Sequence, residues 1–274
     1  MKKLLLGLLV AVWVIHASAF SNPQSEGLIE QVIETTPRVG VYQRAILSRK
    51  GGGKEEWLVI SFPGYPGVLH IAEQDGKIDY ELKGNFLVRA RRHLVSEEIA
   101  VATLDCPSDQ FSYCGDVYRS SEEHVRDVRR QVERLKEYFS PKIKIAILGT
   151  SYGTVSSEIL ANKLSAEIDA AIHTASITNP KTEHGMPLRG MDLGNIAVRQ
   201  LLVHHQSDPC SLTPYLPLKK YENVLPIILV RGSDNARGPA CEAFSEHGFV
   251  GRERLVMKAI GEWLIHNELT VPIE

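Results

Sequence analysis

The sequence predicts an α/β fold with a mostly parallel central sheet flanked by helices. Short, continuously apolar runs alternate along the chain with longer amphipathic stretches, and several runs end at a glycine, proline or aspartate. Continuous apolar runs are typical of strands that are covered on both faces, as in a parallel sheet. The predicted strands cover residues 57–62, 99–104, 143–148, 170–174, 198–204 and 226–230.

Helices are predicted between and after these strands. Residues 121–139 are highly charged but carry apolar residues at helical spacing, and Ser121 is suited to cap their N-terminus. A second helix should run from residue 151 to about residue 164, and a third over residues 252–267. Residues 38–47 are expected to form an N-terminal strand or hairpin, and the alternation as a whole favours one α/β domain. The apolar side of the last helix is predicted to consist of Leu255, Val256, Ala259, Ile260, Trp263 and Leu264.

Composition limits the classes of partner. The chain has 274 residues, 43% of them apolar, which is enough for one sizeable core. It carries 31 Lys plus Arg against 33 Asp plus Glu, so no broad basic field is available for nucleic acid. We therefore expect no nucleic-acid partner.

The N-terminus has the pattern of a secretory signal peptide. Lys2 and Lys3 precede an apolar stretch over residues 4–15, which is followed by small residues at 17–19. The alternative, a retained anchor, is disfavoured because a membrane-spanning helix needs about 20 apolar residues. We expect residues 1–19 to be a cleaved signal peptide and residues 20–274 to form a single domain. The mature protein is then periplasmic or secreted, without stable membrane insertion.

If the protein is exported, its cysteines are expected to form disulfides. All four lie in the mature part, and an even number in an oxidising compartment favours disulfides over buried free thiols. Of the possible pairings we expect Cys106 with Cys114, which closes a short loop, and Cys210 with Cys241. A zinc site is poorly supported, because no CxxC or comparable histidine spacing occurs.

The strongest motif is Gly149-Thr150-Ser151-Tyr152-Gly153, which fits GxSxG. A predicted strand precedes it and a predicted helix follows it, so Ser151 would lie on a tight strand-to-helix turn that exposes its hydroxyl. The helix N-terminus adds backbone N–H groups and partial positive charge beside that hydroxyl. The alternatives are a glycine-rich turn with a capping serine and a phosphate-binding loop, although the lysine of GxxxxGK[ST] is missing.

A serine hydroxyl needs a neighbouring base to act as a nucleophile. Six histidines follow Ser151, and His247 lies in a loop between the last predicted strand and the last helix. That position is expected for the base when the chain order is serine, acid, histidine. His173 and His204 fall within predicted strands and are expected to be structural. The remaining histidines, His184, His205 and His266, are less well placed along the chain.

Two aspartates in predicted loops are candidates for the acid. Asp208 follows the strand at residues 198–204, and Asp234 follows the strand at residues 226–230. Both could be ordinary turn residues. We prefer Asp208, because in this chain order the acid usually follows the strand before the one that precedes the histidine. A disulfide between Cys210 and Cys241 would then tie the acid loop to the histidine loop.

Acyl transfer also needs N–H donors aimed at the developing oxyanion. The backbone N–H of Tyr152, directly after the serine, is the first candidate. The second is the backbone N–H of Tyr65 in the loop Phe62-Pro-Gly-Tyr-Pro-Gly67, with Gly64 as the near alternative. A proline–glycine turn without chemistry would have the same sequence.

With these motifs, residues 57–264 resemble the α/β-hydrolase family, in particular small exported serine hydrolases of bacteria. The resemblance implies a central sheet of about eight strands and a serine hydrolase activity on an ester-type bond. Two features depart from the family pattern. Pro63 stands where many relatives have histidine, and residues 175–197 are short for a lid domain, which implies a minimal lid and an open site.

We therefore expect a serine hydrolase, in class a carboxylic-ester hydrolase, that acts on a small-molecule acyl substrate without metal or organic cofactor. In this mechanism His247 takes the proton from Ser151, Asp208 orients the imidazole, and an acyl-enzyme forms. One alternative is a catalytically silent binding protein with the same fold. Another is an acyltransferase. The sequence leaves the acyl group open, and with it the choice among ester, thioester, lactone and amide.

Overall fold

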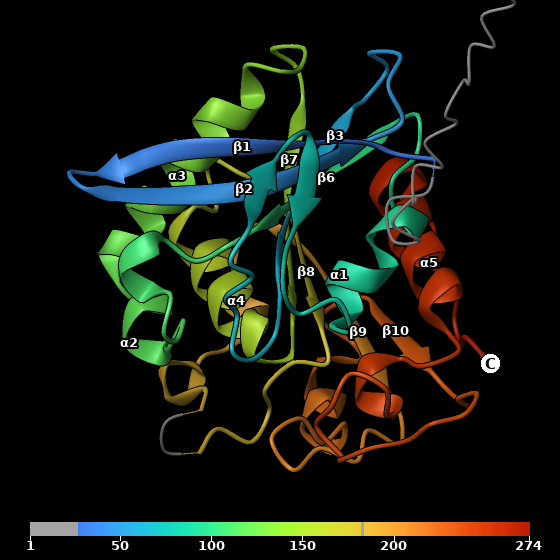
Figure 1. The fold of residues 1–274 in the computed structure, drawn as a ribbon. Helices are drawn as coiled ribbons and strands as arrows, with labels where there is room; N and C mark the ends of the chain where they lie inside the picture. The colour runs from blue at the N-terminus through green and yellow to red at the C-terminus, as the bar shows by residue number, and fades with distance from the viewer. Residues whose placement is uncertain (1–26, 182–183) are drawn as a thin grey trace, which may run out of the picture.

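The centre of the molecule is an eight-stranded sheet with strand order β1-β2-β6-β3-β7-β8-β9-β10 (Figure 1). A computed structural model describes residues 27–181 and 184–274 of the chain. The predicted signal peptide, residues 1–19, lies outside the described residues. The strands are β1 (Ile29–Arg38), β2 (Val41–Arg49), β3 (Trp57–Phe62), β6 (Ile99–Leu104), β7 (Lys144–Thr150), β8 (Ala170–Thr174), β9 (Arg199–His205) and β10 (Ile227–Val230).

Strand direction in the sheet confirms the predicted fold class. The six strands from β6 to β10 in this order pair in parallel. Only the first two strands depart from this pattern, because β1 is antiparallel to β2 and β2 is antiparallel to β6. The parallel strands are nearly all buried, as their continuous apolar sequences predicted.

The N-terminal hairpin is longer than the sequence predicted. The expected element at residues 38–47 corresponds to β2, whereas β1 was not predicted. Most of the β1 side chains are partly or fully exposed, and polar residues such as Glu34 and Thr35 alternate with apolar ones such as Ile33. An edge strand of this kind lacks the continuous apolar run by which the other strands were recognised. A small hairpin of β4 (Ala72–Gln74) and β5 (Lys77–Asp79) was also missed.

Helices cover both faces of the sheet. Side chains from α3 (Glu122–Lys136) and α4 (Thr154–Lys163) pack with Leu58 and Ile60 of β3 on one face. Those from α1 (Phe86–Ala90) and α5 (Glu253–His266) pack with Trp57 and Val59 of the same strand on the other. Figure 1 shows these two layers on opposite sides of the sheet. The alternation along β3 is what divides the core into two layers.

The predicted helices begin and end close to the observed ones. Ser121 caps α3 as expected, because its hydroxyl oxygen accepts a hydrogen bond from the backbone N–H of His124. On α5, Ile260 and Trp263 are buried as predicted, but Leu255 is 47% exposed, so that part of the prediction was wrong. Leu255 lies in the first turn of α5, beside the fully buried Val256.

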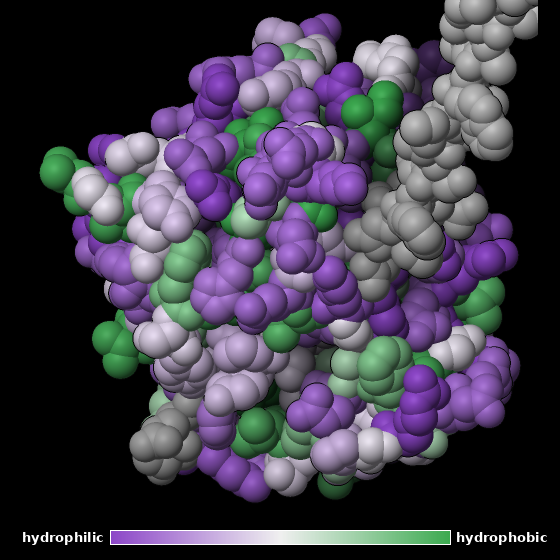
Figure 2. Space-filling model, in the orientation of Figure 1, coloured by the Kyte–Doolittle hydropathy of each residue, from purple (hydrophilic) through white to green (hydrophobic). Residues whose placement is uncertain are grey.

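Both predicted disulfides are present: Cys106 pairs with Cys114, and Cys210 pairs with Cys241. Hydrophilic side chains cover most of the face in Figure 2, with apolar side chains in small groups between them. Among the described residues, none of the helices has the length and apolar character needed to cross a membrane.

Five histidines of the described residues are buried, and burial lowers the pKa of three of them: His124, His173 and His204. Burial lowers the pKa of His124 to about 3, and the positive charge of Arg119 adds to this effect. Burial likewise lowers the pKa of His173 and of His204 to about 4. All three rings are therefore neutral at pH 7. The His124 ring packs edge-on between Phe62 and Tyr118, and neither ring nitrogen has a hydrogen-bond partner among the described residues.

We expect His124→Phe to reduce the loss of stability in acid. The folded pKa of about 3 lies below the ordinary value of 6.5, so the unfolded chain binds the extra proton. The contribution to stability is complete above about pH 6.5 and is lost progressively as the pH falls from there towards the folded pKa of about 3, at about 1.4 kcal/mol per pH unit. Between pH 7.5 and 5.0 the free energy of unfolding in urea should fall by about 2 kcal/mol less in the variant.

The control is His266→Gln, because His266 is exposed near the end of α5. This variant should keep the pH dependence of the unmodified protein. An equal loss of stability in His124→Phe and the unmodified chain would show that His124 accepts a proton in the folded state.

Candidate active site

Ser151 lies on a strained turn between β7 and α4. The turn is a 3-10 segment, Ser151–Gly153, that follows β7 directly and leads into the first turn of α4. The φ angle of Ser151 is +52°, which non-glycine residues rarely adopt. A Cβ on Gly153 would lie 2.1 Å from the backbone oxygen of Phe62, so the turn packs directly against the end of β3. Close packing of this kind explains why the motif has glycine there.

The three predicted side chains lie together at one end of the sheet. The Oγ of Ser151 is 2.8 Å from Nε2 of His247, and Nδ1 of His247 is 2.9 Å from Oδ2 of Asp208. An ionised carboxylate can only accept hydrogen bonds, so His247 donates from Nδ1 to Asp208. Nε2 of the neutral ring is then free to accept from the Ser151 hydroxyl. This is the geometry that activates a serine nucleophile.

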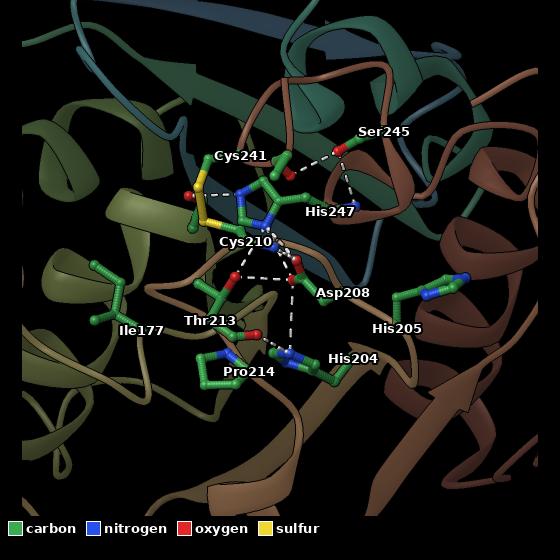
Figure 3. A network of polar contacts seen from close by, with 12 residues as sticks. Ile177, His204, His205, Asp208, Cys210, Thr213, Pro214, Cys241, Ser245 and His247 are labelled. Carbon is green, nitrogen blue, oxygen red and sulfur yellow. Dashed lines mark hydrogen bonds and ion pairs between the residues drawn. A yellow bond between two sulfur atoms is a disulfide. The ribbon is translucent and has the colours of Figure 1, made fainter. Parts of the chain in front are cut away.

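Asp208 is buried, and its carboxylate lies within hydrogen-bond distance of His247 and Thr213 (Figure 3). Burial by itself would raise the pKa of this carboxyl, but the hydrogen bond and charge of His247 outweigh it, with a smaller contribution from His204. The backbone N–H of Cys210 also donates to Oδ1, at 2.9 Å. The pKa of Asp208 therefore lies below its ordinary value, and the carboxylate is available to orient the imidazole at neutral pH.

Thr213 is a contributor that sequence reasoning missed. Its buried hydroxyl donates to Oδ2 of Asp208 at 2.9 Å and lies 3.0 Å from Nδ1 of His247. Its carbonyl oxygen lies 2.9 Å from Nε2 of His204, which is neutral and donates to it. No motif marks this threonine, and its only signal was its place in the loop after Asp208.

Two of the other candidates for acid and base, Asp234 and His173, lie elsewhere. Asp234 forms an exposed ion pair with Arg252 on the surface. Nδ1 of His173 lies 2.8 Å from Oγ of Ser157, and both side chains are fully buried in the core beneath the turn at Ser151. This second serine–histidine pair cannot meet a substrate. The geometry therefore distinguishes two pairs of the same residue types by their access to solvent.

The loop at residues 63–67 lies against Ser151. A Cβ on Gly64 would be 3.3 Å from Cβ of Ser151 and 3.3 Å from the backbone oxygen of Thr150. Gly64, Tyr65 and Tyr152 line the same cavity as Ser151. The proposed oxyanion donors therefore come from two segments that flank Ser151, and both Gly64 and Tyr65 are candidates for the second donor.

A cavity of about 400 Å³ opens above Ser151 and His247. Its walls include the Cys210–Cys241 disulfide, which lies beside the His247 ring in Figure 3. Among the described residues, no lysine or arginine lines the cavity, and Glu242 is its acidic residue. Most of the remaining wall is apolar or aromatic, formed by Tyr65, Leu82, Phe86, Tyr152, Ile177, Leu212 and Phe244. The cavity thus has the size and character of a site for a small organic molecule.

The described residues contain no group of histidine, cysteine, aspartate and glutamate side chains that could hold a metal ion. The polar side chains at the site are instead paired with one another.

Solved structures show which class of protein shares this fold. Est1E from Butyrivibrio proteoclasticus is 14% identical, with 85% of this chain and 97% of that chain covered and a TM-score of 0.57. XC6422 from Xanthomonas campestris, described as an α/β serine hydrolase without lid, is 13% identical over 88% and 96% of the two chains, with a TM-score of 0.57. Dienelactone hydrolase from Anabaena variabilis is 13% identical over 88% and 98%, with a TM-score of 0.56.

These similarities and the sheet order show that the chain has the α/β-hydrolase fold. A search of protein-family models and of curated proteins found no match to the sequence. At 13–14% identity these structures show the fold alone, and activity depends on the residues of the site.

We expect Gly153→Ala to destabilise the protein and Gly261→Ala to stabilise it. The first substitution pushes a methyl group against the backbone of Phe62, and overpacking of this kind costs about 1–3 kcal/mol or more. Gly261 is within α5, and a Cβ there would meet its nearest neighbour at an ordinary 3.6 Å. Alanine in a helix gains up to about 1 kcal/mol over glycine. Thermal and urea unfolding measure both effects, and a neutral Gly153→Ala would contradict the close packing of the turn.

Proposed function

We propose that this protein is a serine hydrolase that cleaves an ester-type bond in a small molecule. The observation that carries the proposal is the continuous chain of hydrogen bonds from Ser151 through His247 to Asp208 at the floor of a cavity. The strained backbone of Ser151 supports it, since active sites are among the places where such conformations gather. The fold that the chain shares with esterases and serine hydrolases is consistent with this chemistry.

The proposed reaction forms an acyl-enzyme and then hydrolyses it. His247 Nε2 takes the proton of the Ser151 hydroxyl as Oγ bonds to the acyl carbon. The backbone N–H groups of Tyr152 and Tyr65 donate to the oxyanion. The imidazolium returns its proton to the leaving alcohol, the ester C–O bond breaks, and an acyl-enzyme remains. Water then attacks the acyl carbon, again with His247 as base, and the carboxylic acid is released.

An acyltransferase would share the first half of this reaction and differ only in the acceptor. The open cavity beside Ser151 supports water as the acceptor, because water can reach the acyl-enzyme directly. Analysis of the products separates the two, since hydrolysis releases the free acid.

Export completes the proposal. Two disulfides in the described part of the chain are compatible with an oxidising compartment. Together with the signal-peptide pattern at residues 1–19, they support a mature protein of residues 20–274, one domain, in the periplasm or outside the cell.

The lining of the cavity favours uncharged substrates. Among the described residues no lysine or arginine lines it to bind a carboxylate or phosphate, while Glu242 adds negative charge to its wall. The apolar walls bind acyl or aryl groups by burial of their surface. We therefore propose a neutral ester of a small apolar or aromatic acid or alcohol as the substrate class.

We expect Ser151→Ala to abolish both turnover of 4-nitrophenyl butyrate and labelling by a fluorophosphonate probe. Asp208→Asn should lower kcat by about 10⁴, because the imidazole then loses the acceptor that fixes its tautomer. Ser157→Ala is the matched control, since that serine has its own histidine partner in the core. The Ser157→Ala variant should be labelled by the probe and should hydrolyse the ester at a rate close to that of the unmodified protein. Equal activity in Ser151→Ala would remove Ser151 from the mechanism.

We expect a preference for neutral over anionic esters of similar size. The 4-nitrophenyl monoester of succinic acid, whose carboxylate would approach Glu242, should have a kcat/KM at least about tenfold below that of the butyrate, or about 1.4 kcal/mol. Glu242→Gln should reduce the difference in kcat/KM between the two esters, and Glu133→Gln on the distant helix α3 should leave it unchanged. Equal kcat/KM for the two esters would refute the proposed substrate class.

A further inference from the structure

Arg119 is a fully buried arginine at the end of the short helix α2 (Asp116–Arg119). Its guanidinium donates three hydrogen bonds: Nε to the carbonyl of Cys114 at 2.8 Å, Nη1 to Oγ of Ser156 at 2.7 Å, and Nη2 to the carbonyl of Pro63 at 3.3 Å. All three acceptors are uncharged oxygens. The side chain therefore joins three separate segments of the chain without forming an ion pair through these bonds.

Two of these segments carry the proposed oxyanion donors. Pro63 begins the loop that contains Tyr65, and Ser156 lies on α4 in the first turns after Ser151. The guanidinium also lies over the ring of Tyr152, with 5.4 Å between its carbon and the ring centroid. Arg119 thus contacts the segments on both sides of the nucleophile.

The third segment fixes the far end of the same loop. The backbone N–H of Cys114 donates to the carbonyl of Pro66 at 3.3 Å, and Cys114 is itself held by the disulfide to Cys106. A Cβ on Gly67 would lie 2.0 Å from Nη2 of Arg119, so the loop packs directly on the guanidinium. The loop is therefore held at Pro63, at Pro66 and at Gly67 by Arg119 or by groups bonded to it.

Burial of the charged guanidinium of Arg119 costs free energy. Burial lowers the pKa of Arg119 to about 10, so the side chain is still charged at neutral pH. A charged group without a carboxylate in contact destabilises a protein core unless its hydrogen bonds are satisfied. A planar fork that reaches several carbonyl and hydroxyl oxygens at once is what arginine, and not lysine, provides.

We propose that Arg119 is a positioning residue for the oxyanion hole: it holds the Tyr65 loop at the distance from Tyr152 at which both N–H groups meet one oxyanion. This inference rests on the proposed serine hydrolase function and goes beyond it, because Arg119 lies behind the cavity wall and touches no substrate. Loss of the clamp should weaken interactions made in the transition state and leave ground-state binding largely intact.

The test compares Arg119→Lys and Ser156→Ala with the unmodified protein. With 4-nitrophenyl butyrate we expect Arg119→Lys to lower kcat by about 10- to 100-fold with KM within about threefold. Ser156→Ala, which removes one acceptor of the clamp, should lower kcat in the same direction by a smaller factor. The inhibition constant of an alkyl trifluoromethyl ketone, which forms a tetrahedral oxyanion on the serine, should rise in parallel with the fall in kcat/KM.

Arg91→Lys is the matched control. Arg91 is also fully buried, but it pairs with Glu30 near the N-terminal hairpin, away from the cavity. Urea unfolding should show comparable losses of stability in Arg91→Lys and Arg119→Lys, while only the second loses kcat and ketone affinity. That difference separates positioning from a general loss of packing.

The inference is overturned if folded Arg119→Lys keeps the kcat and the ketone affinity of the unmodified protein, or if only KM changes. Should Arg119→Lys fail to fold, Ser156→Ala decides in the same way. Ser151→Ala is assayed alongside, because turnover that survives its loss overturns the proposed function instead. Turnover that depends on Ser151 but not on Arg119 or Ser156 overturns only the positioning role proposed for Arg119.

Discussion

The arrangement of the site depends on the hydrogen bond between Nδ1 of His247 and the buried carboxylate of Asp208. A buried carboxylate is stable in its ionised form only when donors surround it. Here His247, Thr213 and the backbone of Cys210 supply them, and the disulfide from Cys210 to Cys241 holds the acid loop beside the histidine loop. The imidazole is thereby oriented before any substrate arrives, with Nε2 facing Ser151.

The sheet brings these groups together although they are far apart along the chain. Ser151 follows β7, Asp208 follows β9, and His247 comes after β10. The strands β7, β8, β9 and β10 are consecutive neighbours and run in parallel, so their carboxyl ends meet at one edge. The side chains that share hydrogen bonds are separated by 96 and 39 positions in sequence. The three side chains can therefore meet only because these strands pair in parallel.

Several polar residues of α4 are buried in the core. All its residues from Thr154 to Ala161 are buried, among them Ser156, Ser157 and Glu158. Burial raises the pKa of Glu158 to about 8, with Ser176 and Lys220 opposing the shift. A helix enclosed on all sides has no polar face, which is why its sequence shows little amphipathic pattern. Its hydroxyl groups instead pair with Arg119 and His173 inside the protein.

The sequence by itself determined the parallel strands and the turn at Ser151, because each depends on residues close together in the chain, and the even number of cysteines indicated disulfides. Continuous apolar runs indicate buried strands whatever lies beside them, and GxSxG describes a local strand–turn–helix. Only the tertiary structure decided that Asp208 rather than Asp234 contacts His247, that Thr213 joins them and that Arg119 clamps the Tyr65 loop. These contacts form between segments that fold together from distant positions, and local propensity contains no information about such distances.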